Sequence, residues 1–419
     1  MLVYSNIIVG SGPSGYLAFK KLNKKSLLIT GETQKKIFTD NVHPKIKLKL
    51  NKKTNKISDL IYSKKNNFSI YSTSEVGGLT NYWGKQFFDY KENEYWPKKI
   101  FKKFTEYKKN LEIINKLYVS IKSEVIKKTS VKNLLINQLT PPILKTPVLN
   151  KGLLKKEFKK KLVEDRVISF KKIKKNLIEV ITENKIFYCK NLILCAGPIG
   201  NALILLRSFP NINYLKFKDD NPRIIFGLIV GKKKYHHSKD TKLMDFDIIK
   251  NNRLAIYSTI YRVDPDHFNI YLKPFIKIFK KVLSKIFFYG QFWVSGEYNE
   301  IKLKKNNDIF HLSAKTINSQ KNNVSIIKKL NNIGFKVLKI INLNFAYGFH
   351  YHCLQINYKG KLYLINEFIS KVNLKNNVFC FDSSVIDKIF LKPPTKTYLA
   401  TTNYLVEKFI KKNSDNLKL

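Results

Sequence analysis

Acidic residues are scarce in this chain of 419 residues, which has 30 Asp and Glu against 78 Lys and Arg and a formal net charge of +48 at pH 7. A charge of this size attracts nucleic acids and anionic lipids. The lysines are spread along the whole length, however, and do not cluster beside aromatic base-stacking motifs. We therefore expect no specific nucleic-acid partner and a weak attraction to anionic membrane surfaces. The same excess is compatible with an anionic substrate such as a nucleotide sugar.

Cysteine is also rare, and no pair has the C-x-x-C spacing of a zinc or redox site. Two of the four cysteines lie within apolar runs, where a free cysteine behaves as a small hydrophobic residue. We expect buried free thiols in a reducing compartment and no metal site. The four residues are Cys189, Cys195, Cys353 and Cys380.

Long apolar runs are missing too, because no uninterrupted stretch is long enough to span a bilayer. Residues 1–5 lead straight into a strand and lack the basic and apolar regions of a signal peptide. A cytoplasmic location is expected. Residues 275–287 predict an amphipathic helix with apolar residues on one face and lysines on the other. Such a helix either lines a substrate domain or docks on the inner face of the membrane.

The N-terminal residues have the pattern of a β-loop-α-β unit. An apolar strand over residues 6–9 precedes a glycine loop, a helix is expected over 13–22, and the next strand over 26–30. The first glycine allows a tight turn, the second lets the backbone approach a pyrophosphate, and the third lets the helix pack on the strand. The helix N-terminus presents free N–H groups to the phosphates. The loop predicts dinucleotide binding by Gly10, Ser11, Gly12, Pro13, Ser14 and Gly15.

One position departs from this pattern. The acidic residue that holds the adenosine ribose normally ends the second strand, where this chain has Thr30. Glu32 follows two residues later and can either take that role or lie in a solvated turn.

The rest of the chain mixes helical and strand patterns. Residues 96–161 have a helical and basic pattern, and residues 211–345 contain strand-like pieces. Alternating β-branched and polar residues predict strands, whereas 3.6-residue periodicity predicts helices. Strands are expected over 167–170, 177–182, 185–189, 191–194, 224–230, 254–261 and 378–381, and helices over 197–207 and 395–410.

Three further segments resemble the glucose-methanol-choline (GMC) family of flavin oxidoreductases, most closely its bacterial sugar-oxidising branch. Residues 77–84, GGLTNYWG, resemble the family's GG-[ST]-x-x-W-G segment beside the flavin ring. The resemblance implies FAD as cofactor. It also implies a noncovalent link, because Tyr82 stands where some relatives attach the flavin to histidine. The implied contacts are Gly77, Gly78, Thr80, Asn81 and Trp83.

The other two segments, the second of them together with the residues 393–397 that follow it, resemble the family's later cofactor contacts. Residues 191–201, NLILCAGPIGN, resemble its "VLAAGAIGTP" strand-turn-helix. Residues 378–385, VFCFDSSV, resemble "LYVADASV", and residues 393–397, PPTKT, resemble "NPTLT". The resemblance implies cofactor contacts by Ala196, Gly197, Asp382, Ser383 and Thr395.

Together these features predict an α/β protein, in which a Rossmann-like FAD-binding domain is interleaved with an α+β substrate domain built on an antiparallel sheet. No Pro/Gly/Ser linker separates two halves of the chain, which favours interleaving. Residues 1–95, 165–210 and 373–419 are assigned to the FAD-binding domain. Residues 96–164 and 211–372 are assigned to the substrate domain.

The catalytic residues are inferred from the family's "H-x-x-G-T-x-R-M" stretch, to which residues 349–355, FHYHCLQ, correspond. The resemblance makes His350 the base and His352 its alternative. In a strand, an i, i+2 pair places both rings on one face, so a base with a helper and a pair of packing residues both remain open. A metal pair is discounted because no third ligand is near. The family's second catalytic residue is replaced by Pro393, which leaves Tyr351, Asn81 and His352 as candidates for that contact.

The implied reaction is oxidation of a CH–OH group in a sugar or glycan-like alcohol, with hydride transfer to flavin N5 and proton transfer to the histidine. The expected partners are this small-molecule alcohol and an electron acceptor that the sequence does not identify. Two alternatives remain: a flavin-binding protein whose active site has degenerated, and a flavin-dependent reductase, either of them associated with a membrane surface.

Overall fold

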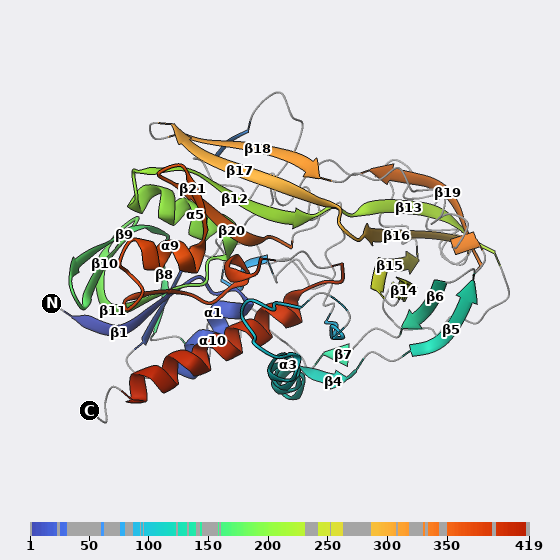
Figure 1. Cartoon of the computed structure of the whole chain (residues 1–419), viewed down its shortest axis with the longest axis horizontal. Helices are drawn as coiled ribbons and strands as arrows, with labels where there is room; N and C mark the ends of the chain where they lie inside the picture. The colour runs from blue at the N-terminus through green and yellow to red at the C-terminus, as the bar shows by residue number, and fades with distance from the viewer. Residues whose placement is uncertain are drawn as a thin grey trace, which may run out of the picture.

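The structure is a computed structural model, and it shows a mixed α/β protein (Figure 1). One sheet packs against helices at the end of the molecule that holds both termini, and two further sheets extend from it. The structure describes residues 2–22, 26–31, 60–62, 76–79, 87–92, 94, 96–122, 125–131, 134–139, 143–144, 158, 161–230, 242–251, 253–262, 286–306, 309–317, 330–331, 334–342, 350–387 and 391–415.

The first sheet has the strand order β8-β2-β1-β11-β10-β9, and β22 also pairs with β11. Its central strands are parallel, with Val9 of β1 opposite Ile29 of β2 and Leu194 of β11. These strands are buried on both faces, which explains their continuous runs of Ile, Leu and Val. The strands are β1 (Val3–Val9), β2 (Ser26–Thr30), β8 (Leu162–Glu164), β9 (Val167–Lys174), β10 (Leu177–Thr182), β11 (Ile186–Leu194) and β22 (Val378–Cys380).

Strand β11 serves two parts of this sheet. Its first half pairs antiparallel with β10, and residues 192–194 pair parallel with β22. The strands expected over 185–189 and 191–194 are therefore one continuous strand. Strands β9, β10 and β11 pair antiparallel and so extend the parallel sheet.

Helices cover this sheet and connect it to the rest of the chain. Helix α10 packs against both α1 and α3. Asn403 of α10 donates a 2.7 Å hydrogen bond from Nδ2 to Oδ1 of Asn110 in α3. Within the described ranges, no helix is both long and apolar enough to cross a membrane. The helices are α1 (Pro13–Leu22), α3 (Phe104–Tyr118), α5 (Gly197–Ser208), α9 (Ile365–Lys371) and α10 (Thr395–Asp415).

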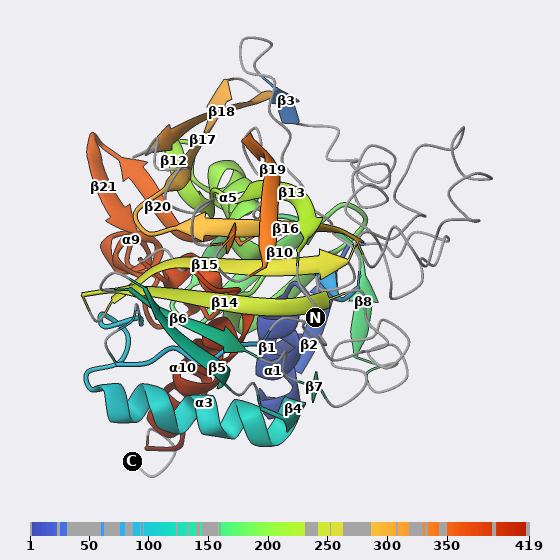
Figure 2. The same cartoon turned by 90° about the vertical axis from the view of Figure 1, so that its right-hand side faces the viewer.

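Two larger sheets, mostly antiparallel, form the other side of the molecule. One has the order β21-β20-β12-β17-β18-β3 and the other β19-β13-β16-β15-β14-β6-β5. Figure 2 shows β16, β15 and β14 side by side in the second of them. The strands are β3 (Leu60–Tyr62), β5 (Val125–Val131), β6 (Leu134–Leu139), β12 (Ile212–Asp220), β13 (Arg223–Ile229), β14 (Lys242–Lys250), β15 (Arg253–Arg262), β16 (Phe287–Val294), β17 (Tyr298–Asn306), β18 (Ile309–Ile317), β19 (Phe335–Asn342), β20 (His352–Tyr358) and β21 (Lys361–Leu364).

Only Asn221 and Pro222 separate β12 from β13, so these two strands run end to end along the top of the molecule in Figure 1. Proline has no N–H for a strand ladder and therefore favours a break at this point. The C-terminal end of β12 thus lies at the junction of the two large sheets. The carboxylates of Asp219 and Asp220 are at that junction.

One helical prediction is wrong, and another lies almost entirely outside the described residues. Among the described residues of 96–161, a long helix covers 104–118, whereas 125–131 and 134–139 form the hairpin strands β5 and β6. Their β-branched residues favour strands. Strand β6 pairs with β14, so β6 and β5 complete the seven-stranded antiparallel sheet that begins at β19. The amphipathic helix expected over 275–287 lies outside the described residues except at its end, where Phe287 begins β16.

The sheet to which each strand belongs can be compared with the predicted domain boundaries, which remain a prediction. Strand β8 lies in the parallel sheet although residues 96–164 were assigned to the substrate domain. Strand β3 pairs with β18 in the six-stranded sheet although residues 1–95 were assigned to the FAD-binding domain.

Candidate functional site

The glycine loop follows β1 and has two glycines that the fold itself requires. The N–H of Gly10 donates to the Ile29 carbonyl at 2.7 Å, and Gly10 has a φ of +95°. A Cβ on Gly10 would lie 2.5 Å from the Cys195 carbonyl oxygen, and one on Gly15 would lie 1.8 Å from the Gly10 carbonyl oxygen. A Cβ on Gly12, by contrast, would have no atom of the described residues within 4 Å. Gly12 therefore faces open space.

A second glycine pair lies against this loop. A Cβ on Gly78, which has a φ of +59°, would be 3.5 Å from the Cα of Gly12. The N–H of Gly77 donates to Ser11 Oγ at 2.9 Å, and Ser11 Oγ lies 2.8 Å from Thr30 Oγ1 at the end of β2. Two glycine segments that are far apart in the sequence thus meet, and a hydroxyl pair occupies the place where the pattern predicts an acidic residue.

The remaining residues predicted around the loop divide into two groups. Pro13 and Ser14 form the first turn of α1, where the proline costs no hydrogen bond because the first helical N–H groups have no partner within the helix. Four predicted cofactor contacts lie outside the described residues: Glu32, Thr80, Asn81 and Trp83.

Asp382 follows β22 and connects that strand to the start of α5. Its Oδ2 accepts from the N–H of Gly197 at 2.7 Å and from Nδ2 of Asn201 at 2.9 Å. Its Oδ1 accepts from the N–H of Ser384 at 2.9 Å. Burial raises the pKa of this carboxyl, and the hydrogen bonds from Ser384 and Gly197 oppose the shift. Cys380 Sγ also donates to Oδ1, at 3.4 Å, so the predicted cofactor residue already accepts from several donors within the protein.

The other predicted contacts surround Asp382. The N–H of Ala196 donates to Asn201 Oδ1 at 3.3 Å, and Gly197 has a φ of +71° with no atom within 4 Å of a Cβ position. Ser383 donates from Oγ to the Tyr351 carbonyl at 2.8 Å. Thr395 is the first residue of α10. The Asp382 segment therefore links the start of α5 to the segment that contains both candidate histidines.

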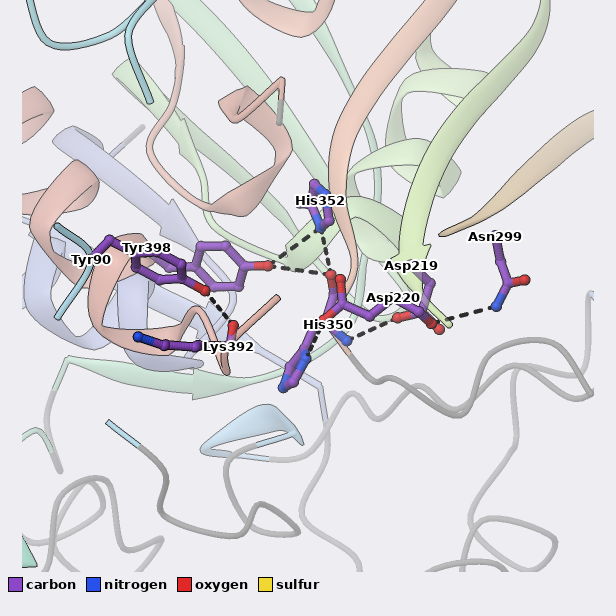
Figure 3. A network of polar contacts seen from close by, with 8 residues as sticks. All are labelled: Tyr90, Asp219, Asp220, Asn299, His350, His352, Lys392 and Tyr398. Carbon is purple, nitrogen blue, oxygen red and sulfur yellow. Dashed lines mark hydrogen bonds and ion pairs between the residues drawn. The ribbon is translucent and has the colours of Figure 1, made fainter. Parts of the chain in front are cut away.

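The ring of His350 lies against the carboxylate of Asp220 (Figure 3). Its Nδ1 lies 2.7 Å from Asp220 Oδ2, and its backbone N–H donates to Asp219 Oδ1 at 3.0 Å. A carboxylate can only accept, so Nδ1 carries the proton and the lone pair of the neutral ring is on Nε2. The side chain of His350 is 19% exposed, whereas that of Asp220 is 1% exposed. The ring thus combines a buried carboxylate partner with access to solvent.

His352 is fully buried and has a different environment. Its Nδ1 lies 2.6 Å from the His350 carbonyl oxygen, which can only accept, so Nδ1 carries the proton. Tyr398 of α10 also donates to this carbonyl, at 3.2 Å. Burial lowers the pKa of His352 to about 4, although Asp220 opposes the shift. His352 is therefore neutral near pH 7 and holds the backbone of the histidine segment in place.

The prediction that both histidine rings would lie on one face of a strand is wrong. Strand β20 begins only at His352, so His350 lies before it. The strand continues through Cys353, whose φ is +59°. The two rings consequently have separate partners, Asp220 for His350 and a backbone carbonyl for His352.

The buried neutral His352 makes the stability of the protein depend on pH. Its pKa falls from 6.5 to about 4 on folding, so the unfolded chain binds more protons below pH 6.5 and stability is lost as pH falls through that range. We expect the free energy of unfolding to fall by about 2 kcal/mol from this residue alone between about pH 7.5 and about pH 5. Urea unfolding at the two pH values measures the change.

The matched variant for this measurement is His352→Asn, whose amide nitrogen replaces Nδ1 as donor without titrating. We expect its stability to fall less than that of the wild type over the same pH range. Equal pH dependence in the wild type and His352→Asn would contradict the neutral, buried state of His352.

Sequence reasoning missed a buried ionic cluster beside these residues. Lys392 Nζ lies 2.8 Å from Asp247 Oδ2 and 3.1 Å from Glu94 Oε1, and all three side chains are 4% exposed. Burial alone would lower the pKa of Lys392, but the two carboxylates outweigh it and the pKa is raised. The Lys392 carbonyl also accepts from the hydroxyl of Tyr90 (Figure 3). Lys392 immediately precedes Pro393.

The acidic partners could have been suspected from one signal. In a chain with so few carboxylates, Asp245 and Asp247 lie within an otherwise apolar, strand-like stretch, and Asp219 and Asp220 are adjacent at the end of another strand-like stretch. Buried carboxylates need partners and cluster at functional sites. Within the part of the chain that the structure describes, no group of three or more His, Cys, Asp or Glu side chains is arranged to hold a metal ion. All four cysteines are free and buried, as predicted.

No family model matches the sequence, and no curated protein matches it. The fold is nevertheless similar to solved flavoproteins. A variant of formate oxidase from Aspergillus oryzae RIB40, described for its FAD modification, has a TM-score of 0.50 and 10% sequence identity and covers 98% of this chain and 99% of its own.

Other solved structures are more distant. A flavoprotein/dehydrogenase from Cytophaga hutchinsonii has a TM-score of 0.34 and 8% identity, covering 97% of this chain and 79% of its own. Glycine oxidase from Bacillus cereus ATCC 14579 has a TM-score of 0.34 and 10% identity, covering 98% and 95%. At this identity the formate oxidase similarity establishes the fold alone. The chain has a Rossmann-like fold of the kind found in FAD-binding flavoproteins, as predicted.

Proposed function

We propose that the protein is an FAD-dependent oxidoreductase of the GMC type that acts on the CH–OH group of a sugar or glycan-like alcohol, with FAD held noncovalently. One observation carries the proposal: a continuous set of contacts leads from the glycine loop to His350. Gly10 packs on Cys195 at the end of β11, Gly197 donates to Asp382, and Ser383 donates to Tyr351 beside His350. A Rossmann phosphate site and a solvent-accessible base are thereby joined.

Gly10, Gly12 and Gly15, here called the glycine cradle, and the residues around them suit a dinucleotide. Gly12 and Gly197 have open space where side chains would otherwise be, and the first turn of α1 presents N–H groups at the end of a parallel strand. Gly10, Ser11, Gly12 and the start of α1 would hold the pyrophosphate, and Gly77 and Gly78 would border it. Bound FAD would supply a hydride acceptor.

His350 is suited to act as the base of this reaction. Its Nδ1 is held by Asp220, so the Nε2 lone pair is available to accept the proton of a substrate hydroxyl. The carboxylate of Asp220 then stabilises the positive charge that develops on the ring. His352 cannot replace it easily, because burial holds its pKa at about 4. We therefore assign His350 as the base and His352 as a positioning residue.

Pro393 favours a second candidate function. Proline cannot donate a hydrogen bond to a substrate oxygen, so the second catalytic contact of the GMC reaction must come from another side chain. Without one, the same cofactor site would serve a flavin-dependent reductase or bind flavin without catalysis. A decrease in the oxidised flavin band on adding NAD(P)H, with no alcohol present, would favour the reductase.

Anaerobic titration of the FAD-loaded protein with a panel of sugars and simple alcohols tests the proposed oxidation. We expect the oxidised flavin band to bleach with at least one alcohol, because hydride transfer reduces the ring. Dithionite reduction of the same sample is the control for an intact flavin. If dithionite reduces the flavin and no alcohol does, alcohol oxidation is contradicted, and a reductase or a noncatalytic flavin-binding protein becomes the favoured function.

A further inference from the structure

The six-stranded sheet has one face packed on the core and one open face. Helix α5 packs against β12, β17 and β20, and the guanidinium of its Arg207 lies 4.9 Å from the ring centroid of Phe310 on β18. In Figure 1 the sheet runs along the top of the molecule, with α5 beneath it. The buried residues on the α5 side are Leu215, Phe217, Ile301, Leu303, Leu312 and Ala314. Because successive side chains of a strand point to opposite faces, the residues between these form the outer face of the sheet.

Lysines from three neighbouring strands lie side by side on this outer face. Lys216 of β12 pairs with Lys302 of β17, which pairs with Ser313 of β18. Directly paired residues project to the same face, as do residues two apart along a strand. Four half-buried or exposed lysines therefore form an array, here called the basic face: Lys216, Lys302, Lys304 and Lys315. Their backbone positions are spaced about 5 Å across the strands and about 7 Å along them.

Negative charge on the basic face comes from one residue. Among the half-buried and exposed side chains that β12, β17 and β18 place there, Glu300 is the only carboxylate. Glu300 lies opposite Lys315 in the register, but its Oε1 is 2.9 Å from Lys216 Nζ. Lys304 and Lys315 form no ion pair within the described ranges of the chain. Four lysines against one carboxylate leave this face with a net positive charge of its own.

Tyr214 lies against two of these lysines. Its ring centroid is 3.9 Å from Lys302 Nζ and 5.8 Å from Lys216 Nζ. The two lysines are paired directly across the strands, where like charges repel each other, and the ring attracts both. An ammonium over the ring also covers the surface on which a nucleic-acid base would stack. The basic face therefore suits a plane of anionic groups better than it suits a single-stranded nucleic acid.

An exposed apolar side chain borders the basic face. Leu362 of the edge strand β21 is 47% exposed. It pairs with Asn357 of β20, which pairs with Tyr214, so Leu362 lies on the outer face in line with this tyrosine. The exposed Lys359 and Lys361 lie beside it in the hairpin between β20 and β21. An apolar side chain among lysines is typical of a surface that lies in a membrane interface.

We propose that the basic face, together with Leu362, docks on the anionic headgroups of a membrane surface. The lysines bind lipid phosphates through charge-assisted hydrogen bonds, and the Leu362 side chain enters the headgroup layer. A lipid surface fits better than a polymer, because the lysines are spread in two dimensions over three strands. The weak attraction expected from the net charge is thereby assigned to one particular surface. The proposal does not depend on the proposed reaction, since neither FAD nor His350 takes part in the docking.

Co-sedimentation of the full-length protein with lipid vesicles tests the docking. Vesicles of phosphatidylglycerol and phosphatidylcholine supply the anionic surface, and vesicles of phosphatidylcholine alone are the uncharged control. We expect binding to the anionic vesicles only. Raising KCl from about 0.1 M to about 0.5 M should weaken this binding at least about tenfold, because salt screens exposed charges.

Because the whole chain is basic, the decisive comparison is between two double variants that lose the same charge. The variant Lys304→Gln, Lys315→Gln removes two exposed lysines from the basic face. We expect about 20-fold weaker vesicle binding, since each lysine near an anionic surface contributes about fivefold. The matched control Lys174→Gln, Lys175→Gln removes two exposed lysines from the hairpin of β9 and β10. Its binding should stay within about twofold of the wild type.

A fluorescent label locates the contact directly. Ser313 is exposed on the basic face opposite Lys302, whereas Asn176 is exposed in the hairpin of β9 and β10. The four native cysteines are buried, so a dye attaches preferentially to Ser313→Cys or Asn176→Cys. We expect brominated lipids in the anionic vesicles to quench the dye at position 313 and to leave the dye at position 176 unquenched.

Several results would overturn the proposal. The first is a wild-type protein that does not bind anionic vesicles, and the second is unchanged binding in Lys304→Gln, Lys315→Gln. Equal weakening in both double variants would make docking a property of the overall charge and not of the basic face. Weaker binding of poly(U) by Lys304→Gln, Lys315→Gln with unchanged vesicle binding would assign the face to nucleic acid instead.

Discussion

Replacing His350 with alanine is expected to slow flavin reduction by an alcohol about 10²–10⁴-fold while FAD remains bound, because general-base catalysis contributes rate enhancements of this size. His350 lies before β20 and pairs with Asp220 through its side chain. Its removal therefore leaves the glycine cradle unchanged. Stopped-flow measurement of the flavin band under anaerobic conditions gives the rate.

Chemical rescue separates this catalytic role from a structural one. Imidazole added to the His350→Ala variant should restore part of the rate, because the space left by the ring lies beside Asp220 and the wild-type side chain is 19% exposed. In the double variant His350→Ala, Asp220→Asn the rescue should be weaker, since the carboxylate that orients the imidazole and stabilises its positive charge is missing. An unchanged rate in His350→Ala would exclude it as the base.

A pair of glycine variants in the phosphate loop should separate folding from cofactor binding. In Gly15→Ala the new Cβ would lie 1.8 Å from the Gly10 carbonyl oxygen, a clash with backbone that the structure cannot relieve locally. We expect a loss of more than about 4 kcal/mol in the free energy of unfolding, and hence an unstable protein. Solubility and urea unfolding of the purified variant measure this loss.

The Gly12→Ala variant should behave in the opposite way. Its Cβ would meet no atom within 4 Å, and a Gly→Ala change at a permitted conformation stabilises by about 0.4–1 kcal/mol. We therefore expect unchanged or slightly higher stability without cofactor, together with loss of bound FAD, because the methyl group would occupy the place where the backbone approaches the pyrophosphate. Full FAD binding by Gly12→Ala would contradict the assignment of this loop as the phosphate site.

The first β-loop-α-β unit could be predicted from sequence almost to the residue, because its signals are local. The helix expected over 13–22 and the strand over 26–30 are α1 and β2. The glycines of the loop are required by close backbone contacts within that unit and with β11. Where a few neighbouring residues determine the local structure, the elements predicted from the sequence agree with those in the fold.

The histidine site could be predicted only in part. His350 was identified from its resemblance to a family motif, but its partner Asp220 lies 130 positions away. Their proximity depends on the pairing of β12 with β20, which contains register shifts that no local pattern reveals. The start of β20 at His352 likewise follows from this pairing. Sequence therefore supplied the candidate base but not the carboxylate beside it.

The ionic cluster illustrates the same limit. Glu94, Asp247 and Lys392 come from a loop, a strand of the seven-stranded sheet and the segment before α10. Taken alone, each of the three residues resembles a surface residue. In a chain with 78 basic residues, nothing in the sequence distinguishes one buried lysine from the others. Only the fold shows that these charges are buried together. Similarly, pairing with β14 determines that residues 134–139 form a strand.

The most direct test of the central claim is the absorption spectrum of the purified protein, followed by titration with FAD. We predict a flavin spectrum, either as purified or after loading, with saturation at one FAD per chain and release of free FAD on denaturation, as expected for a noncovalent cofactor. A colourless protein that cannot be loaded with FAD would contradict the claim that the glycine cradle of Gly10, Gly12 and Gly15 binds this dinucleotide.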